Sequence, residues 1–596
     1  MSGDTIPHRL YARARATPDA GATHHKEGGV WVTVTWSAYA AQVRQAASAL
    51  IALGVQPGEV VCILGFNRPE WAILDLATMA AGGAPAGIYE TSSPAETHYI
   101  LQHARAPVVL VENAAQWAKV REVRDRLPEL RHVVLMRDAE PIDDPMVLTW
   151  EQFHARGAGV EPAELDARVA ALKPDGLATL IYTSGTTGPP KAVMLSHHNL
   201  SWTASVAIAL VAIGVDDHTL SYLPLAHIAE QMFTLHVPIT AGCQVWFAES
   251  VPKMPANLVE VRPTVLFGVP RVWEKIHTRL AARLAEATGI KKFLVDNARV
   301  VGGKVNALRN RGEEPTGLLK LQYQVAHAVV FSKLHTALGL DRVKILVSGA
   351  APIAADVLEF FATLDLPIRE VYGQSEDSGP TSFNFPGRTR FGTVGPALPG
   401  VEVALAPDGE VRVRGPNVFL GYFKDPAATA EALQDGWLCS GDIGTLDADG
   451  FLTIVGRKKE ILITAGGKNI APVNIEAALK GIDVVGDAVV IGDRRKYLTV
   501  LLTLDPEAVT RLAAELGVTA AEVGRHPAVL AAIQKGVDAV NREVSRVEAV
   551  KRFRVLPAAF EVGDELTATM KVRRKRVVEK YAAEIEALYV EDGPGG

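Results

Sequence analysis

The sequence predicts an α/β protein of at least two domains, in which layered sheets and helices are flanked by an antiparallel β subdomain. The chain has 596 residues, well beyond the length at which a single hydrophobic core keeps growing. Helical and β-rich runs alternate along residues 10–112, which is typical of parallel α/β layers. Residues 401–423 alternate between apolar and polar side chains, which favours an antiparallel sheet.

The first hundred residues supply elements of these layers in order. Residues 39–53 have the spacing of an amphipathic helix, and a second helix is predicted over 69–79, where a proline stands at its start. Short runs rich in valine and isoleucine at 60–64 and 107–111 predict strands.

Composition and charge exclude several classes of protein. Hydrophobic residues make up 48% of the chain and charged residues 21%, and the formal net charge is -6. An acidic balance gives no support for a nucleic-acid partner. Cys62, Cys243 and Cys439 are too few and too scattered for a disulfide framework or a zinc site. Because we expect neither a signal peptide nor a membrane-spanning helix, a cytoplasmic location is predicted. The high alanine and arginine usage suggests a bacterial source.

A loop between two predicted strands has the composition of a phosphate-binding site. It follows the apolar run 177–182 and reads Thr183, Ser184, Gly185, Thr186, Thr187, Gly188, Pro189, Pro190, Lys191. Glycines let backbone N–H groups face an anion, hydroxyls add donors, and a lysine adds charge. The loop is not a Walker A motif, because prolines precede the lysine and alanine follows it. The alternative is a flexible surface turn.

Two further strands are predicted to end in loops of small residues. The strand over 343–347 leads into Gly349 and Ala350, and the strand over 367–371 leads into the run Tyr372, Gly373, Gln374, Ser375, Glu376. Such strand ends form ligand crevices at the carboxyl edge of α/β sheets. An aromatic ring such as Tyr372 stacks on a flat base, and the Glu376 carboxylate suits Mg²⁺. A tight structural corner is the alternative.

Other features are ambiguous when taken alone. His227 lies in the apolar run 222–228, where a histidine is more often structural than functional. The mainly helical stretch 276–340 is rich in basic residues, which indicates either a solvated surface, the interpretation we favour, or contact with anionic membrane lipid.

Taken together, the motifs resemble those of the adenylate-forming superfamily, in the same order and over nearly the whole chain. This superfamily contains acyl-CoA synthetases, peptide-synthetase adenylation domains and beetle luciferases. Residues 227–229, 269–273 and 377–380 are most similar to long-chain acyl-CoA synthetases of the bubblegum type. The resemblance implies a large N-terminal domain, 1–458, and a small mobile α+β C-terminal domain, 459–596, with Lys459 as the hinge.

The resemblance also implies a role for each motif residue. Catalysis is expected of Lys571, His227 and Glu376, and CoA contact of Gly466 and Gly467. Metal contact is expected of Thr183 and Glu376, with Mg²⁺, ATP and CoA as cofactors or substrates. ATP or AMP contact is expected of Thr183, Ser184, Gly185, Thr186, Thr187, Gly188, Lys191, Gly349, Ala350, Tyr372, Gly373, Gln374, Ser375, Asp442 and Arg457.

Two positions depart from the pattern of relatives. Met570 stands before Lys571 where the superfamily commonly has glycine, and Gln231 stands where some long-chain synthetases have a gating tryptophan.

The implied function is fatty acid–CoA ligation through an acyl-adenylate, which yields acyl-CoA, AMP and pyrophosphate. The alternatives are a fatty acyl-AMP ligase that loads a carrier protein, a catalytically silent lipid-binding homologue, and an oxygenase of the luciferase type. Intact Glu376, Asp442, Arg457 and Lys571 oppose the silent homologue. Peripheral membrane contact and a homodimer remain open.

Overall fold

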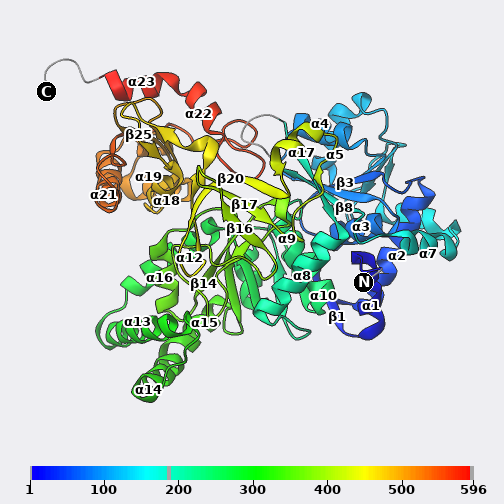
Figure 1. Cartoon of the computed structure of the whole chain (residues 1–596), viewed down its shortest axis with the longest axis horizontal. Helices are drawn as coiled ribbons and strands as arrows, with labels where there is room; N and C mark the ends of the chain where they lie inside the picture. The colour runs from blue at the N-terminus through cyan, green and yellow to red at the C-terminus, as the bar shows by residue number, and fades with distance from the viewer. Residues whose placement is uncertain (1–2, 184–188, 591–596) are drawn as a thin grey trace.

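A computed structural model describes residues 3–183 and 189–590 of the chain. The N-terminal part, blue to yellow in Figure 1, contains two eight-stranded sheets and one five-stranded sheet. The C-terminal part, orange to red, has its own three-stranded sheet and lies against one side of the larger body. The predicted α/β class, with a flanking antiparallel subdomain, is confirmed.

The first large sheet carries the predicted phosphate-binding loop at one end. Its strand order is β18-β9-β8-β4-β3-β5-β6-β7. The bounds are β3 Val60–Leu64, β4 Ala84–Ile88, β5 Val108–Val111, β6 His132–Leu135, β7 Val147–Leu148, β8 Leu177–Thr183, β9 Lys191–Ser196 and β18 Gly421–Tyr422. Strands β3 to β8 are parallel, whereas β9 pairs antiparallel with both β8 and β18. Every residue of β3 is buried, as expected for a strand covered on both faces.

The second large sheet has the order β15-β14-β13-β12-β10-β11-β1-β2. Its bounds are β1 Gly21–Glu27, β2 Val30–Thr35, β10 His218–Ser221, β11 Gln244–Phe247, β12 Val265–Gly268, β13 Ile345–Ser348, β14 Ile368–Tyr372 and β15 Ser382–Phe383. Strands β13 and β14 run parallel, so the two small-residue loops that follow them emerge at the same edge. This arrangement agrees with the crevice that the sequence predicts.

The five-stranded antiparallel sheet covers residues 402–457. It contains β16 Glu402–Leu405, β17 Glu410–Arg414, β19 Leu433–Gln434, β20 Trp437–Leu446 and β21 Leu452–Arg457. The polypeptide then passes through a short 3₁₀ turn, η6 Lys458–Glu460, into the C-terminal part. That part contains β22 Leu462–Ile463, β23 Asn469–Ile470, β24 Val485–Ile491, β25 Leu498–Leu504 and β26 Val550–Val555.

Helices cover the faces of the sheets. Those of the N-terminal part are α1 Ile6–Ala16, α2 Trp36–Ala52, α3 Pro69–Ala80, α4 Pro94–Ala104, α5 Ala114–Val123, α6 Trp150–Arg156, α7 Pro162–Ala171, α8 His197–Val211, α9 Ile228–Gln231, η3 Met232–His236, α10 Val237–Ala241, α11 Met254–Val261, α12 Pro270–Ala285, α13 Gly289–Arg309, α14 Gly317–Ala326, η4 His327–Phe331, α15 Ser332–Leu338, α16 Ala355–Thr363, η5 Ser375–Asp377 and α17 Pro426–Ala432. Besides η6, two further short 3₁₀ turns are η1 Arg124–Arg126 and η2 Gly157–Gly159. Helix α3 is buried at every residue, because it packs in the centre of the main core.

The C-terminal part has a hydrophobic core of its own, built from residues between Leu462 and Leu588. Its helices are α18 Pro472–Lys480, α19 Pro506–Leu516, α20 Ala520–Val523, α21 Pro527–Glu543, α22 Arg574–Lys580 and α23 Ala582–Val590. Two helices follow Lys571, with Tyr581 between them. Val577 is buried, whereas the adjacent Val578 is 39% exposed.

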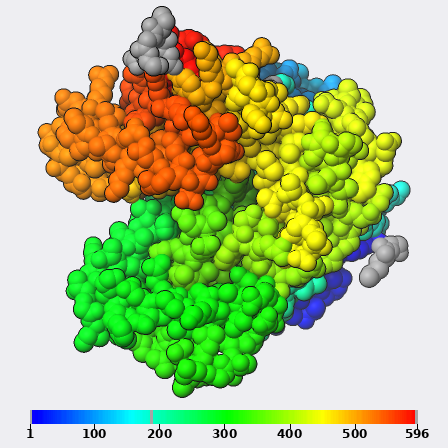
Figure 2. All heavy atoms as spheres, turned by 60° about the vertical axis from the view of Figure 1, so that its left-hand side comes forward, coloured from blue at the N-terminus to red at the C-terminus, as the bar shows by residue number. Residues whose placement is uncertain are grey.

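Among the described residues, no helix is both long enough and apolar enough to cross a bilayer. Figure 2 shows a recess where the orange C-terminal part meets the green and yellow surface of the N-terminal part.

Candidate active site

Asp442, Arg457 and Tyr372 meet at the junction of two sheets. Asp442 on β20 is the register partner of Arg457 at the end of β21, and Arg457 Nε lies 2.9 Å from Asp442 Oδ1. The Tyr372 hydroxyl, at the end of β14, donates to Asp442 Oδ2 at 2.7 Å. Burial raises the pKa of Asp442, whereas the Arg457 charge opposes this shift. The cluster thus places a carboxylate, a cation and an aromatic ring where the two sheets meet.

The ends of β8 and β9 hold the phosphate-loop segment at both sides. Thr183 and Lys191 are register partners, and Thr183 Oγ1 donates to the Lys191 carbonyl at 3.3 Å. The central residues Ser184, Gly185, Thr186, Thr187 and Gly188 lie outside the described residues. The Lys191 ammonium lies over the ring of Tyr422, 4.7 Å from its centroid.

Tyr422 connects this loop to Glu376. Its hydroxyl donates to Glu376 Oε1 at 2.7 Å, and the backbone N–H of Phe419 donates to the Glu376 carbonyl at 2.9 Å. Because β18 pairs with β9, Tyr422 lies opposite Val193, close to Lys191. Sequence reasoning missed Tyr422. Nothing in the spacing signals its role, since more than two hundred residues separate it from Lys191.

The loops after β13 and β14 are tightly packed, which explains their glycines. A Cβ on Gly373 would lie 1.7 Å from the Gly379 carbonyl oxygen, and one on Gly349 would lie 2.6 Å from Val371 Cγ1. Ala350 has a positive φ of 70°. Gln374 precedes the short 3₁₀ turn that contains Ser375 and Glu376.

Two buried polar atoms beside these loops have no hydrogen-bond partner among the described residues. They are Gln374 Nε2 and Ser348 Oγ. Buried polar groups are normally paired, so unpaired ones at a strand edge favour a bound polar ligand. These atoms, together with the small residues around them, fit a nucleotide at this edge.

His227 caps the N-terminus of α9, and a buried network fixes the segment that leads to it. The backbone N–H of Ala229 donates to His227 Nδ1 at 3.2 Å. Burial, together with the nearby Lys571 charge, lowers the pKa of His227 to about 4. The ring is therefore neutral near pH 7, and its proton must be on Nε2, since Nδ1 accepts. A neutral Nε2–H is a hydrogen-bond donor.

Glu230 and Asn67 form the centre of the network behind His227. Glu230 Oε1 accepts from Ser221 Oγ at 2.9 Å and from the Tyr222 N–H at 3.2 Å. Asn67 Nδ2 donates to the Leu223 carbonyl at 2.7 Å. Burial raises the pKa of Glu230 to about 7. The network fixes the chain between β10 and α9, and sequence reasoning did not find it.

Lys571 reaches the same site from the C-terminal part. Crowding of its ammonium by protein atoms lowers the pKa of Lys571, as does the Arg457 charge, while Asp442 and Glu376 oppose the shift. The residue keeps an exposed surface, so the desolvation is partial. Thr567 Oγ1 accepts from the Lys571 N–H at 3.1 Å, and the Lys571 carbonyl accepts from the Thr567 N–H at 2.8 Å. These bonds close a tight turn around Met570, whose φ is 61°.

The positive φ at Met570 explains the glycine that relatives commonly have there. Left-handed backbone favours glycine, because a Cβ crowds the following carbonyl. Met570 adopts this conformation with a 61% exposed side chain, so the chain keeps the turn despite the substitution.

The side chain of Lys459, the predicted hinge, is 85% exposed although it lies two positions after Arg457, and the predicted CoA residues lie in an exposed turn of the C-terminal part. Lys459 is in the exposed turn η6, with its Nζ 3.9 Å from Glu431 Oε1. Gly466 and Gly467 form the turn between β22 and β23, where Gly467 has a φ of 72°. The neighbouring Ala465 N–H donates to the Arg495 carbonyl at 2.9 Å, within the C-terminal part. The structure therefore brings Lys571, and not the glycine turn, to Asp442 and Arg457.

The donor set fits a metal only in part. Among the described residues, no cluster of three or more carboxylate, histidine or cysteine side chains could hold an ion. Glu376 and Thr183 supply oxygen atoms, and Mg²⁺ commonly combines one or two such ligands with substrate phosphates and water. The residues present thus fit an Mg²⁺ that arrives with a nucleotide.

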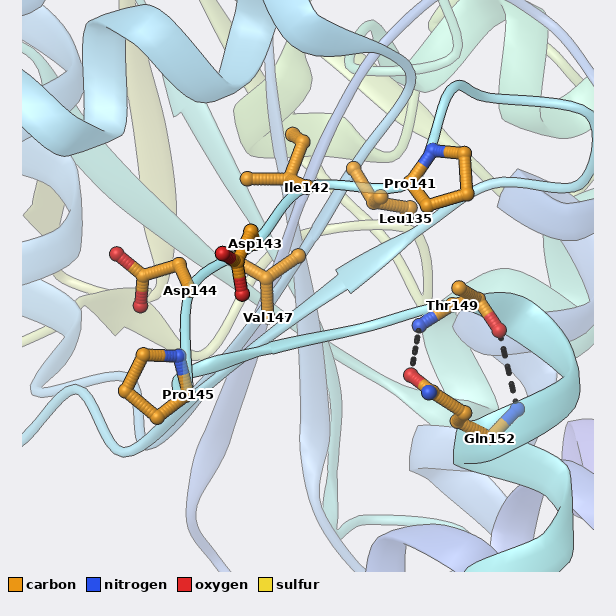
Figure 3. Close-up of a pocket in the computed structure, with 9 residues that line it drawn as sticks. All are labelled: Leu135, Pro141, Ile142, Asp143, Asp144, Pro145, Val147, Thr149 and Gln152. Carbon is orange, nitrogen blue, oxygen red and sulfur yellow. Dashed lines mark hydrogen bonds between the residues drawn. The ribbon is translucent and has the colours of Figure 1, made fainter.

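Two surface hollows lie outside the cluster of Asp442, Arg457 and Lys571. A cavity of about 320 Å³ lies beside β6 and β7, and Figure 3 shows its lining. Three of its polar side chains have partners: Gln152 and Thr149 cap α6 together (2.9 and 3.2 Å), and Asp144 pairs with Arg124. Strand β7 is at the opposite end of the sheet from β9 and β18. A second hollow, of about 440 Å³, lies beside Tyr422 and α17.

The fold and this set of residues define an adenylate-forming enzyme. Residues 10–423 match the family described as AMP-binding enzyme, and residues 459–593 match the AMP-binding enzyme C-terminal domain. The chain therefore belongs to the AMP-binding enzyme family, as the sequence motifs predict.

Curated relatives place the chain near the bubblegum-type branch. It is 39% identical to the long-chain-fatty-acid–CoA ligase ACSBG2 of Xenopus laevis, over 95% of this chain and 81% of the relative. It is 38% identical to the long-chain-fatty-acid–CoA ligase FadD15 of Mycobacterium tuberculosis, over 98% and 97% of the two chains.

Solved structures show the same fold at lower identity. The adenylation domain of a carboxylate reductase from Mycobacterium chelonae has a TM-score of 0.77 at 22% identity, covering 98% of this chain and 91% of that one. O-succinylbenzoate coenzyme A synthetase of Bacillus subtilis, in complex with AMP, has a TM-score of 0.69 at 22% identity, covering 96% and 98%.

Proposed function

We propose that the protein is an ATP-dependent long-chain fatty acid–CoA ligase. The observation that carries the proposal is the position of Lys571, which comes from the C-terminal part and shares one electrostatic environment with Glu376, Asp442 and Arg457. Relatives that carry this activity in their names match nearly the whole chain. The domains are then 1–458, which holds nucleotide and acid, and 459–596, which brings Lys571.

In the first half-reaction, a fatty acid carboxylate attacks the α-phosphorus of ATP, the bond to the β-phosphate oxygen breaks, and pyrophosphate leaves. Negative charge grows on the phosphoryl oxygens, and the Lys571 ammonium and the Arg457 guanidinium offset it. The His227 Nε2–H orients the carboxylate by donation. Asp442 accepts from the ribose hydroxyls, while Tyr372 stacks on the base.

The phosphate loop binds the β- and γ-phosphates in this proposal. Lys191 adds a charge at the end of the loop, and the two loops after β13 and β14 supply close backbone contact through Gly349, Ala350, Gly373, Gln374 and Ser375. When bound, Mg²⁺ would neutralise phosphate charge, and Glu376 with Thr183 would hold it.

In the second half-reaction, the CoA thiol attacks the acyl carbon of the mixed anhydride, and AMP leaves with the electrons of the acyl–oxygen bond. Lys571 takes no part in this step. We infer that the C-terminal part turns about Lys459, which withdraws Lys571 and brings the turn at Gly466 and Gly467 to the thiol. Lys459 suits a hinge because its turn is exposed and links two separate cores.

We also propose that α13 and α14 contact anionic membrane lipid, the less favoured sequence interpretation. Apolar side chains that the sequence did not place at the surface are exposed here: Leu318 by 70%, Leu321 by 58% and Val325 by 57%. These three lie on one face of α14, and Figure 1 shows both helices at the edge of the molecule. Residues 283–333 contain nine Lys and Arg against four Asp and Glu, in a chain of net charge -6. Cations around exposed apolar groups suit an anionic bilayer surface.

Vesicle sedimentation tests the lipid contact. The wild type should bind vesicles that contain phosphatidylglycerol more strongly than vesicles of phosphatidylcholine. Leu318→Ser combined with Leu321→Ser should weaken binding, while Val30→Ser, at an equally exposed apolar residue of β2, should not. Equal binding by both variants would contradict this proposal. The homodimer, cytoplasmic location and bacterial source stay predictions.

A substrate panel tests the proposed activity. Free acids from acetate to very long chains are supplied with MgATP, and AMP release is measured with and without CoA. Release that requires a long-chain acid and is completed by CoA supports the ligase. Formation of acyl-adenylate without transfer to CoA would favour the acyl-AMP ligase, and inactivity on every acid would favour the silent homologue.

A further inference from the structure

The loop that carries Lys571 rests on a small surface of the N-terminal part, which we call the socket. The socket consists of Tyr89, Thr91, Glu96 and Ala226. Thr91 Oγ1 donates to the Ala568 carbonyl at 2.7 Å, and Arg573 Nη2 lies 2.8 Å from Glu96 Oε1. Tyr89, Ala226 and Ala568 form a separate buried apolar cluster.

These contacts lie on both sides of Lys571 in the sequence. Ala568 is three residues before Lys571, and Arg573 is two residues after it. A second contact ties Arg573 to its own loop, since its backbone N–H donates to the Glu565 carbonyl at 2.7 Å. Because both flanking residues are anchored, the position of the intervening lysine is constrained.

Contacts within the N-terminal part fix the Glu96 carboxylate independently of the Lys571 loop. It is the third residue of α4 and takes part in a capping box, in which Glu96 Oε2 accepts from the Ser93 N–H at 3.1 Å and Ser93 Oγ accepts from the Glu96 N–H at 3.2 Å. The other oxygen, Oε1, faces Arg573. The side chains of Glu96 and Arg573 are only 20% and 27% exposed, so water screens the pair weakly.

The socket also adjoins the acyl side of the site. Ala226 directly precedes His227, and Tyr89 directly follows Ile88, the last residue of β4. A loop seated on Ala226 therefore brings Lys571 near His227, which agrees with the lowering of the His227 pKa by the Lys571 charge.

We propose that Thr91 and Glu96 are positioning residues that seat the Lys571 loop for adenylation. The proposal rests on the proposed function, in which Lys571 serves only the first half-reaction. The socket is then occupied during adenylation and empty during thioester formation. Loss of either anchor should lower the first rate and spare the second.

Other ion pairs between the two parts provide a control. Lys275 Nζ on α12 lies 2.9 Å from Glu507 Oε1 on α19, and both side chains are well exposed, by 44% and 65%. This pair joins the same two bodies but does not touch the Lys571 loop. Exposed pairs contribute little to stability, so Lys275→Met should leave both half-reactions close to wild type.

The test uses the full-length protein and two assays. Acid-dependent ATP–pyrophosphate exchange reports adenylation, and conversion of synthetic acyl-adenylate by CoA reports the second step. Glu96→Gln keeps the capping box, because glutamine also serves at that position, yet it removes the charge that faces Arg573. We expect about a tenfold to hundredfold loss of exchange, as for a catalytic group that is misplaced rather than removed. Thr91→Val should lose exchange similarly, whereas the second step should stay within about twofold.

A double-mutant cycle shows whether Glu96 acts through Arg573. Arg573→Gln should match Glu96→Gln, and the double variant should lose little more than either single one. Equal losses in both half-reactions, unchanged exchange, or fully additive losses would each overturn the inference. If the wild type itself fails to form acyl-adenylate with any acid, the proposed function fails. A working wild type with an unaffected Glu96→Gln variant refutes only the socket.

Discussion

Tyr422 offers a way to separate two contacts with two substitutions. Tyr422→Phe removes the hydroxyl that donates to Glu376 Oε1 at 2.7 Å but keeps the ring under Lys191. A hydrogen bond to a charged group is worth about 1.5–3 kcal/mol, which corresponds to roughly 10- to 150-fold. Tyr422→Leu also removes the ring, and a partly exposed cation–π contact adds about 0.5–1 kcal/mol, or roughly two- to fivefold.

The assay for Tyr422 is pyrophosphate exchange as a function of MgATP concentration, together with equilibrium MgATP binding by calorimetry. If Tyr422 positions Glu376 for the metal, both variants should bind MgATP more weakly than the wild type does. Tyr422→Leu should bind it more weakly than Tyr422→Phe. Circular dichroism and thermal unfolding exclude a folding defect. Wild-type binding by Tyr422→Phe would refute the role of the hydroxyl, and equal effects of both variants would refute the role of the ring.

Three further predictions follow from single sites. Met570→Gly should raise the free energy of unfolding by about 1 kcal/mol or less, since it relieves the left-handed strain at a φ of 61°, while Met570→Ala should bring no such gain; thermal melts compare the two. Burial raises the pKa of Glu230 to about 7, so the folded protein keeps a proton that the unfolded chain loses near pH 4.5. The free energy of unfolding should therefore fall on the order of 3 kcal/mol as the pH rises from about 4.5 to about 7. Glu230→Gln should remove that part of the pH dependence in urea titrations at pH 5 and 8. Lys459→Pro should spare pyrophosphate exchange and abolish acyl transfer to CoA, because a fixed φ obstructs rotation in η6; equal loss of both steps would contradict a hinge.

Local patterns were enough to predict much of the fold and the residues with distinctive motifs. Strand β3 and helix α3 lie almost at their predicted limits, because β3 is a short run rich in valine and isoleucine and a proline marks the start of α3. The predicted residues Asp442, Arg457 and Tyr372 do meet, although they come from two different sheets. The resemblance to known enzymes, rather than spacing, linked them.

Residues whose importance depends on tertiary contact could not be predicted. Tyr422 and Glu96 are ordinary residues of a short strand and a helix N-terminus, and only folding brings them to Glu376 and Arg573. The exposure of Leu318 also depends on which face of α14 packs inward. The positive φ at Met570 follows from hydrogen bonds between Thr567 and Lys571, which the sequence does not reveal.

The central claim is that Lys571 supplies charge to adenylation and nothing to thioester formation. The direct measurement compares Lys571→Ala with wild type on two substrates: a long-chain acid with MgATP, and synthetic acyl-adenylate with CoA. We expect the first rate to fall by about a hundredfold to a thousandfold or more, because a preorganised charge is removed from the transition state, while the second stays near wild type. Equal impairment on both substrates, or normal adenylation, would contradict the account.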